Sequence, residues 1–129
     1  MDASGEREAV RDEVRAVAMA YAQALHRADT AALGQIFHDA AHLYAGQDGA
    51  LIDWPKAKFL ERVGARAALS GEVDVEIEAI HVAGPETAHV TLHVAVPPRR
   101  FTDYLQFLKL GGEWRIINKI FRVAEGPGV

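Results

Sequence analysis

Asp103 stands within the run FTDYLQFLKLGGEWRIINKIFRV, residues 101–123. This run predicts two β-strands joined by a Gly-Gly turn, with apolar residues at both odd and even positions. A carboxyl group in such surroundings is desolvated, and desolvation raises its pKa toward the range useful for proton transfer. Asp103 is therefore the first candidate for a general base or acid. The alternative is a structural carboxyl held by hydrogen bonds or by a nearby base.

The predicted pairing of the strands brings two more polar side chains to the face of Asp103. A two-residue turn pairs Leu105 with Asn118, and side chains opposed across an antiparallel pair share a face. Continued into the preceding strands, the same register adds His81. The histidine could move a second proton and the amide could donate to a developing oxyanion, as an enolisation site requires. Both could instead be ordinary, satisfied residues of a sheet.

The opposite face of the sheet is expected to receive Tyr104 and Lys119. Its other members are polar at one end (Asp74, Glu76, Glu78, His89 and His93) and apolar at the other (Leu108, Ile117, Phe121 and Val123). Glu78 should lie near His93, as an opposite-charge pair when the histidine is protonated. Because monomers rarely expose so large an apolar patch, we expect a homodimer through this outer sheet face.

Six aromatic residues could line a pocket for a small apolar ligand, since such sites are mostly apolar with a few placed polar groups. They are Trp114, Phe107, Trp54, Phe59, Tyr21 and Tyr44. Aromatic residues at core spacing are equally expected in an ordinary core. Of the six, Trp114 is the one we most expect at a pocket wall.

His38 and His42 have the i, i+4 spacing of metal ligands on a helix, and Asp39 lies between them. The predicted helix ends between the two histidines, and no third ligand is evident. We therefore expect no metal site. No other cofactor is expected either.

The periodicity of apolar residues predicts helices first and strands second, which is an α+β fold. Apolar residues spaced by three and four indicate a helix over residues 6–28, and Asp29-Thr30 can cap a second, shorter one. A short hairpin is expected at residues 41–45 and 50–52. A third helix should open at Asp53-Trp54-Pro55 and end near Ser70-Gly71. From residue 73 the period is 2, which predicts four consecutive strands of a long antiparallel sheet.

The length of 129 residues predicts a single domain over residues 1–129, with residues 1–5 and 124–129 frayed. The net charge is −4 and the 14 basic residues are scattered, so the basic patch of a nucleic-acid binder is missing. The absence of cysteine excludes disulfides and thiol chemistry and fits a reducing compartment. With no apolar run of membrane-spanning length and no secretory signal, we expect a cytoplasmic location without membrane contact.

The order of these elements resembles the nuclear transport factor 2-like superfamily, a cystatin-like α+β cone. Three stretches resemble its lumazine-binding and SnoaL-like subgroup: FHDAAHLY (37–44), DGALIDWPKAKFLERV (48–63) and DYLQFLKLGGEWRIINKIF (103–121). The resemblance implies a curved half-barrel with helices over its concave face, a pocket in the cone and commonly a homodimer through the sheet. Related folds use a pocket aspartate to move a proton next to a carbonyl.

The function expected from these features is the binding of a small molecule. The protein is then either a cofactor-free lyase or isomerase with Asp103 as proton acceptor, or a non-catalytic dimeric binding or scaffold module. A third hypothesis is an interaction domain that joins larger enzymes through its sheet face.

Overall fold

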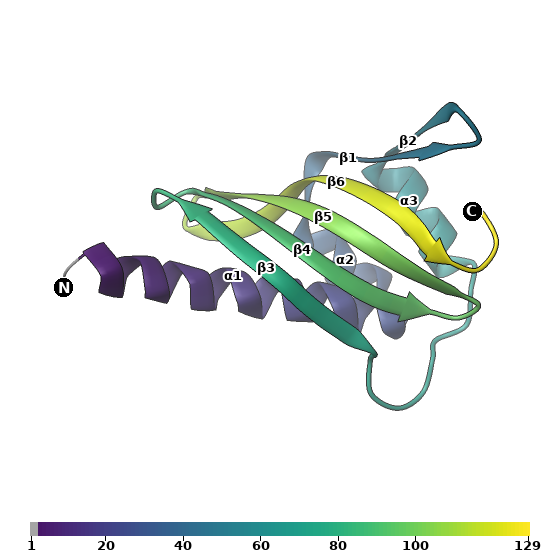
Figure 1. The fold of residues 1–129 in the computed structure, drawn as a ribbon, viewed down its shortest axis with the longest axis horizontal. Coiled ribbons are helices and arrows are strands. Elements are labelled where there is room, and N and C mark those ends of the chain that lie inside the picture. Colours follow the sequence, from purple (N-terminus) through teal and green to yellow (C-terminus); the bar gives the residue numbers. More distant parts are fainter. Residues whose placement is uncertain (1–2) are drawn as a thin grey trace.

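The computed structural model describes residues 3–129, which form three helices packed on one face of a curved six-stranded sheet (Figure 1). The helices are α1 (Ala3–His26), α2 (Thr30–Ile36) and α3 (Lys56–Gly64). The strands are β1 (Phe37–Gln47), β2 (Ala50–Pro55), β3 (Val75–Ala83), β4 (Thr87–Val96), β5 (Arg99–Leu110) and β6 (Glu113–Glu125). The predicted α+β class is confirmed.

Helix α1 lies across the sheet with the apolar stripe predicted from the sequence. Val14 and Tyr21 are fully buried, and Leu25 is nearly so. Residues 3–5, expected to fray, belong to the helix, whereas residues 1 and 2 lie outside the described residues. At the other end, the amide of Leu69 and the guanidinium of Arg66 donate to main-chain carbonyls of the last turn.

Of the two aspartates predicted to cap the short helices, one does so and the other does not. Asp29 caps α2, since its carboxylate accepts a hydrogen bond of 3.0 Å from the amide of Ala32. Asp53 does not cap α3: it lies in β2 and forms a hydrogen bond of 2.7 Å with His42. Helix α3 also ends earlier than predicted, at Gly64, because the next residues turn back to close the end of α1.

The sheet has the order β2-β1-β6-β5-β4-β3. Strands β3 to β6 form the predicted antiparallel meander. Strand β1 pairs with β6 in parallel, so the 37–55 hairpin extends the sheet at its β6 side and makes it mixed. This hairpin brings β2 and the start of α3 over one end of the inner face, which is the face that the helices cover.

A β-bulge in β6 overturns part of the predicted register. Phe107 pairs with Ile116 as expected, but the next pair is Gln106 with Asn118, so Ile117 is the additional residue. Because successive side chains alternate between faces, one extra residue exchanges the faces of everything beyond it. Asn118 therefore lies on the outer face, and Lys119, which we expected outside, lies on the inner one.

A second bulge in β3 overturns the placement of His81. Ile77 pairs with Leu92 as predicted, but Ala79 pairs with Thr91, which leaves Glu78 as the additional residue. His81 then pairs with His89 on the outer face. The expected contact between Glu78 and His93 is confirmed, at 2.9 Å.

The C-terminal residues, which we expected to fray, are hydrogen-bonded to the body of the protein. Strand β6 continues to Glu125. The guanidinium of Arg99 donates to the carbonyls of Pro127 (2.9 Å) and Gly128 (2.8 Å). The amide of Val129 donates to the side chain of Gln47 at 2.9 Å. The chain end is therefore held against β1 and the start of β5.

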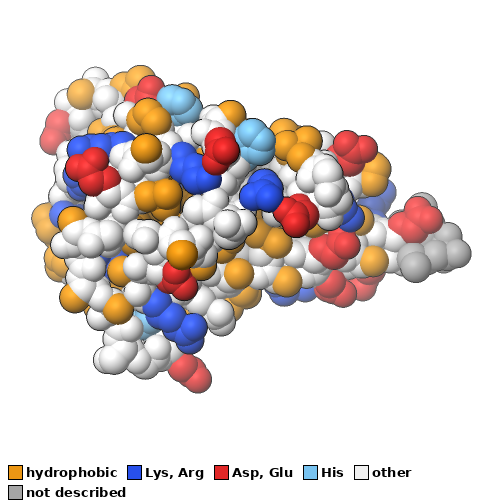
Figure 2. All heavy atoms as spheres, turned by 180° about the vertical axis from the view of Figure 1, so that it is seen from behind, with side chains coloured by type: hydrophobic (Ala, Val, Ile, Leu, Met, Phe, Trp, Pro, Cys, Tyr) orange, Lys and Arg blue, Asp and Glu red, His pale blue; other side chains and the backbone are white. Residues whose placement is uncertain are grey.

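On the helical side of the molecule, acidic and basic side chains alternate with hydrophobic ones and no field of a single sign is visible (Figure 2). None of the helices within residues 3–129 is long and apolar enough to cross a membrane.

Candidate functional site

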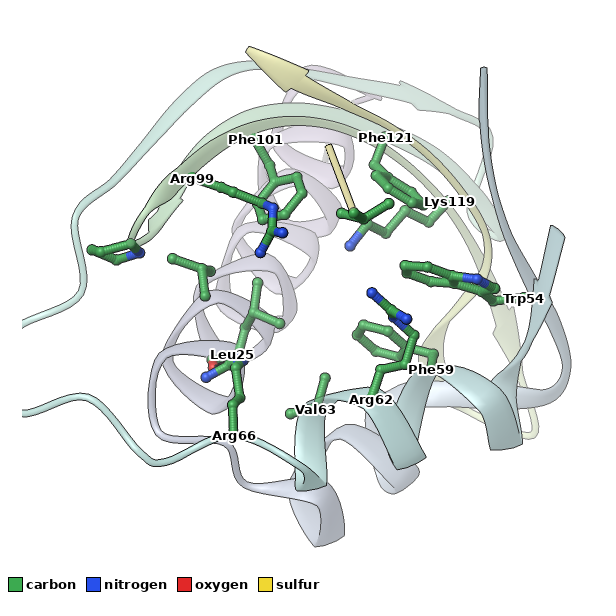
Figure 3. A pocket seen from close by; sticks show the side chains of 13 residues that line it. Leu25, Trp54, Phe59, Arg62, Val63, Arg66, Arg99, Phe101, Lys119 and Phe121 are labelled. Carbon is green, nitrogen blue, oxygen red and sulfur yellow. Dashed lines mark hydrogen bonds between the residues drawn. The ribbon is translucent and has the colours of Figure 1, made fainter. Parts of the chain in front are cut away.

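A cavity of about 250 Å³ opens between α3 and the inner face of the sheet (Figure 3). Its aromatic walls come from four elements: Trp54 from β2, Phe59 from α3, Phe101 from β5 and Phe121 from β6. Aliphatic side chains from α1, α3 and β4 complete the lining: Leu25, Val63 and Val96. A concave, mainly apolar enclosure of this kind is the usual form of a small-molecule site.

Three buried polar side chains lie below the cavity. The phenol of Tyr21 donates a hydrogen bond of 2.5 Å to Oδ2 of Asp103. The ammonium group of Lys119 donates to the phenol oxygen of Tyr21 at 2.6 Å and lies 3.5 Å from Oδ2 of Asp103. Asp103 is fully buried and Lys119 is 4% exposed. Of the three, Lys119 is the one that lines the cavity.

Burial shifts the pKa values of Tyr21 and Lys119 in this triad. It raises the pKa of the Tyr21 phenol well above its usual value, and the charge of Asp103 raises it further. Burial also lowers the pKa of Lys119, although the charge of Asp103 opposes this effect. The rings of Phe59, Tyr21 and Phe121 surround the Lys119 ammonium at 5.1, 5.2 and 5.3 Å, which favours its charged form.

Three arginines also line the cavity: Arg62 from α3, Arg66 from the segment just after α3, and Arg99 from β5. The Arg62 guanidinium lies over the Trp54 ring at 4.3 Å from its centroid. In Figure 3, the nitrogen atoms of Arg62, Arg99 and Lys119 point toward the open centre, whereas Arg66 lies at the edge beside Leu25. The residues described as lining the cavity include no acidic side chain.

The predicted catalytic residues are not brought together. Asp103 points inward as expected, but it lies behind Lys119 and does not line the cavity. Asn118 donates to the side chain of Gln106 at 3.0 Å on the outer face. His81 lies on that face too, with its ring centroid 6.2 Å from that of His89. The two bulges therefore separate the expected enolisation site into two faces.

Of the six aromatic residues predicted to contact a ligand, Trp54 and Phe59 line the cavity. Tyr21 belongs to the buried triad below it. The other three lie elsewhere in the structure. Phe107 is a core residue, Tyr44 stacks on His42, and Trp114 donates a hydrogen bond of 3.1 Å to Glu13 of α1.

Lys119 and the three arginines line the cavity but were not candidates from the sequence, and neither were Phe101 and Phe121 of its aromatic wall. The sequence feature that could have indicated Lys119 is its position between Asn118 and Ile120 in a mostly apolar strand. The bulge prevented a correct assignment of the face of the sheet on which Lys119 lies. Arg62 and Arg66 share the i, i+4 spacing that places two side chains on one side of a helix. That spacing could have indicated a cationic group at the end of α3, where Arg66 follows the last helical residue, Gly64.

The histidines and carboxylates form no metal-ligand set: residues 3–129 contain no group of three or more such side chains with suitable geometry. The carboxylate of Asp39 instead accepts a hydrogen bond of 2.8 Å from Lys56. The ring of His42 contacts Asp53.

Comparison with known proteins gives a family and a fold. A family model described as "Putative lumazine-binding" matches residues 9–122. The structure is similar to that of a nuclear transport factor 2-like protein of unknown function from Silicibacter pomeroyi, with a TM-score of 0.82, 25% identity, and coverage of 95% of this chain and 99% of that one. No curated protein matches the chain.

Two further solved structures show the same fold. A nuclear transport factor 2-like protein of unknown function from Shewanella baltica has a TM-score of 0.82 at 21% identity, covering 98% of this chain and 99% of that one. A ketosteroid isomerase-like protein from Erwinia carotovora atroseptica has a TM-score of 0.72 at 17% identity, covering 90% and 97%.

Proposed function

The chain belongs to the family described as "Putative lumazine-binding", within the nuclear transport factor 2-like fold, and we propose that it binds a small organic molecule in the cavity above Lys119. The observation that carries this proposal is a buried, charged triad placed below an aromatic enclosure. Burying an ion pair costs several kcal/mol for each ion, so a core built for stability alone would gain little from it. Contact between Lys119 and a ligand would explain why the buried triad is present.

The chemistry of the walls supports the same proposal. Trp54, Phe59 and Phe101 offer flat apolar surfaces that pack against a ring or an aliphatic body. Lys119 is the polar contact near the centre, and Tyr21 with Asp103 fixes its position. A few placed polar groups in an apolar enclosure orient a ligand.

The proposal is tested with the neutral fluorescent probe N-phenyl-1-naphthylamine. Its fluorescence should rise on binding, and Trp54→Ala should weaken its affinity about tenfold, because an aromatic wall is removed. Leu51→Ala is the matched control, since Leu51 lies in the same strand but is 72% exposed and does not line the cavity. Failure of the probe to bind, or equal affinity in the Trp54 variant, would overturn the proposal.

Proton transfer is the second candidate function, and Lys119 rather than Asp103 is the group that would touch the substrate. Burial lowers its pKa, which makes the loss of its proton easier than for an exposed lysine, and the amine so formed can take a proton from carbon next to a carbonyl. The C–H electron pair then forms the C=C bond of an enolate, the carbonyl π pair moves onto oxygen, and Asp103 stabilises the ammonium that forms again on Lys119. Asp103 is then a positioning residue of a cofactor-free lyase or isomerase.

Hydrogen exchange of acetophenone in D2O, followed by NMR, tests this chemistry without a known substrate. The wild-type protein should accelerate loss of the methyl proton signal, and Lys119→Met should abolish the acceleration. Lys58→Met controls for exposed amines, since the Lys58 side chain is 48% exposed. Equal rates for wild type and Lys119→Met would leave the non-catalytic binding module as the function.

We further propose that two copies associate through the outer sheet face. Large apolar side chains there are open to solvent, with exposures of 39% for Tyr104 and 49% for Ile120. Sedimentation velocity at micromolar concentration should show a dimer, and Ile120→Asp should convert it to a monomer. A monomeric wild-type protein would contradict this assembly.

A further inference from the structure

The cavity has an excess of positive charge, although the whole chain carries a net charge of −4. Four cationic side chains line it, Arg62, Arg66, Arg99 and Lys119, and no acidic side chain of the described residues does so. The carboxylate of Asp103 lies behind Lys119 and balances one of the four charges, and Val129 also lines the cavity. Clefts with low-dielectric walls concentrate the field of such charges.

The three cavity arginines lack the acidic partners that Arg100 and Arg115 of the sheet have. Arg100 is paired with Asp74 at 3.1 Å, and Arg115 with Glu113 at 2.6 Å. Within the described residues, no ion pair is found for Arg62, Arg66 or Arg99. Guanidinium groups without an acidic partner beside an apolar enclosure are suited to an oxyanion. Arg62 can bind it through two parallel hydrogen bonds, whereas Arg99 already donates from Nε and Nη2 to the carbonyls of Pro127 and Gly128 and offers its remaining nitrogen, Nη1.

Arg66 adds evidence from hydrogen bonding. One terminal nitrogen donates to the carbonyl of Leu25, while the other is buried without a hydrogen-bond partner in the described structure. A buried donor without an acceptor is unfavourable, and a bound oxyanion at this edge would supply the acceptor. Burial also lowers the pKa of Arg66, as expected for a guanidinium without a carboxylate neighbour.

The apolar and cationic parts of the cavity are adjacent, which defines the shape of the ligand. Phe101 and Phe121 lie beside Arg99 and Lys119 in the upper wall, and Trp54 lies next to Arg62 (Figure 3). A ring packed against these aromatic side chains would place a substituent at the open centre, where the three cationic groups point. A neutral ligand would leave those groups without a counter-charge.

We infer that the ligand is an organic oxyanion, a carboxylate or phosphate carried on a flat or aliphatic apolar body. The inference rests on the proposed binding function and specifies its ligand class. Arg62 and Arg99 bind the oxyanion, together with Lys119, and Arg66 extends the site toward α1. The aromatic walls hold the apolar body.

Competition against bound N-phenyl-1-naphthylamine tests the inference with two ligands of nearly identical shape, naphthalene-2-carboxylate and naphthalene-2-carboxamide. The carboxylate should bind about tenfold or more tightly than the amide, since hydrogen bonds to charged groups are stronger than those to neutral ones. The preference should shrink as salt is added, because ions screen exposed charges.

Arg62 gives the sharpest variants, since its guanidinium makes no hydrogen bond to the protein in the described structure and its loss should not disturb the fold. Arg62→Gln should lower the preference for the carboxylate over the amide at least threefold, while Arg62→Lys should retain most of that preference. Arg100→Gln, a paired arginine outside the cavity, should leave both affinities unchanged.

The outcomes distinguish failure of the proposed binding function from failure of the proposed ligand class. If neither the neutral probe nor the naphthalene ligands bind, the proposed function fails and the inference fails with it. If carboxylate and amide bind equally, or if Arg62→Gln leaves the preference intact, the cavity binds ligands but the oxyanion class is wrong. A parallel titration with 2-naphthyl phosphate distinguishes the two oxyanions. Whichever of the two anions binds more tightly identifies the natural oxyanion as phosphate or carboxylate.

Discussion

The ion pair between Lys119 and Asp103 should be the most strongly coupled charged contact in the protein. The charges are 3.5 Å apart, and at an effective dielectric constant of about 20 their attraction is about 5 kcal/mol. Desolvation cancels much of this, so the pair adds little net stability. Removing one partner leaves a buried charge alone, and Lys119→Met or Asp103→Asn should each lower the free energy of unfolding by about 3–5 kcal/mol.

A double-mutant cycle measures the coupling between the two residues. The combined variant Asp103→Asn/Lys119→Met should lose far less than the sum of the single losses, with an interaction energy of about 3 kcal/mol. Urea unfolding followed by circular dichroism gives the four free energies. Protein concentration must be kept constant, because association stabilises the folded state.

The exposed pair Lys58 and Glu61 is the matched control. Its atoms are 3.8 Å apart, and its side chains are 48% and 74% exposed. The cycle Lys58→Met/Glu61→Gln should give an interaction energy of at most about 0.5 kcal/mol. If the Lys119 and Asp103 losses were additive within about 0.5 kcal/mol, the two groups would not act as a buried pair and the description of the triad would be refuted.

Two further predictions follow from burial and capping. Because burial and Asp103 hold the proton on Tyr21, Tyr21→Phe should leave the amplitude of tyrosine ionisation near pH 10, followed by absorbance at 295 nm, unchanged; a smaller amplitude in the variant would contradict it. The unfolded chain releases the Tyr21 proton above about pH 10 while the folded chain keeps it, so this group makes stability fall as the pH rises beyond that value. Asp29→Ala should lower the free energy of unfolding by about 1 kcal/mol through loss of the α2 cap, as measured by urea unfolding, with Asp29→Asn as the control that keeps the cap. An unchanged urea midpoint in Asp29→Ala would show that the cap does not contribute to the free energy of unfolding.

The helices and the strand pairing near the turns were predictable because they depend on local pattern. The three- and four-residue spacing in α1 identified Val14, Tyr21 and Leu25 as its buried stripe. The Gly-Gly turn fixed the pairing of Phe107 with Ile116. Both features are determined by residues close together in the chain.

The faces of Asn118 and Lys119 were not predictable from alternation alone. An uninterrupted strand would place Lys119 in water, and a buried lysine contradicts the usual preference for exposed charge. In the bulged strand Lys119 instead meets Asp103 and Tyr21, which come from another strand and from α1. Such a contact between distant segments leaves no periodic signal.

In β3 the phase change was visible in the sequence. Apolar residues occupy odd positions up to Ile77 and even positions from Ile80 onward, which marks the bulge at Glu78. The cationic cavity was harder to foresee. Arg62, Arg99 and Lys119 come from α3, β5 and β6, and only the tertiary fold places them around one enclosure.

A crystal structure of the protein with naphthalene-2-carboxylate tests the central claim most directly. We expect the naphthalene ring to lie in the cavity against Trp54 and Phe101, with the carboxylate directed at Lys119 and Arg62. The same ligand bound on the outer sheet face, with the cavity free of it, would contradict the claim that the enclosure above Lys119 is the binding site.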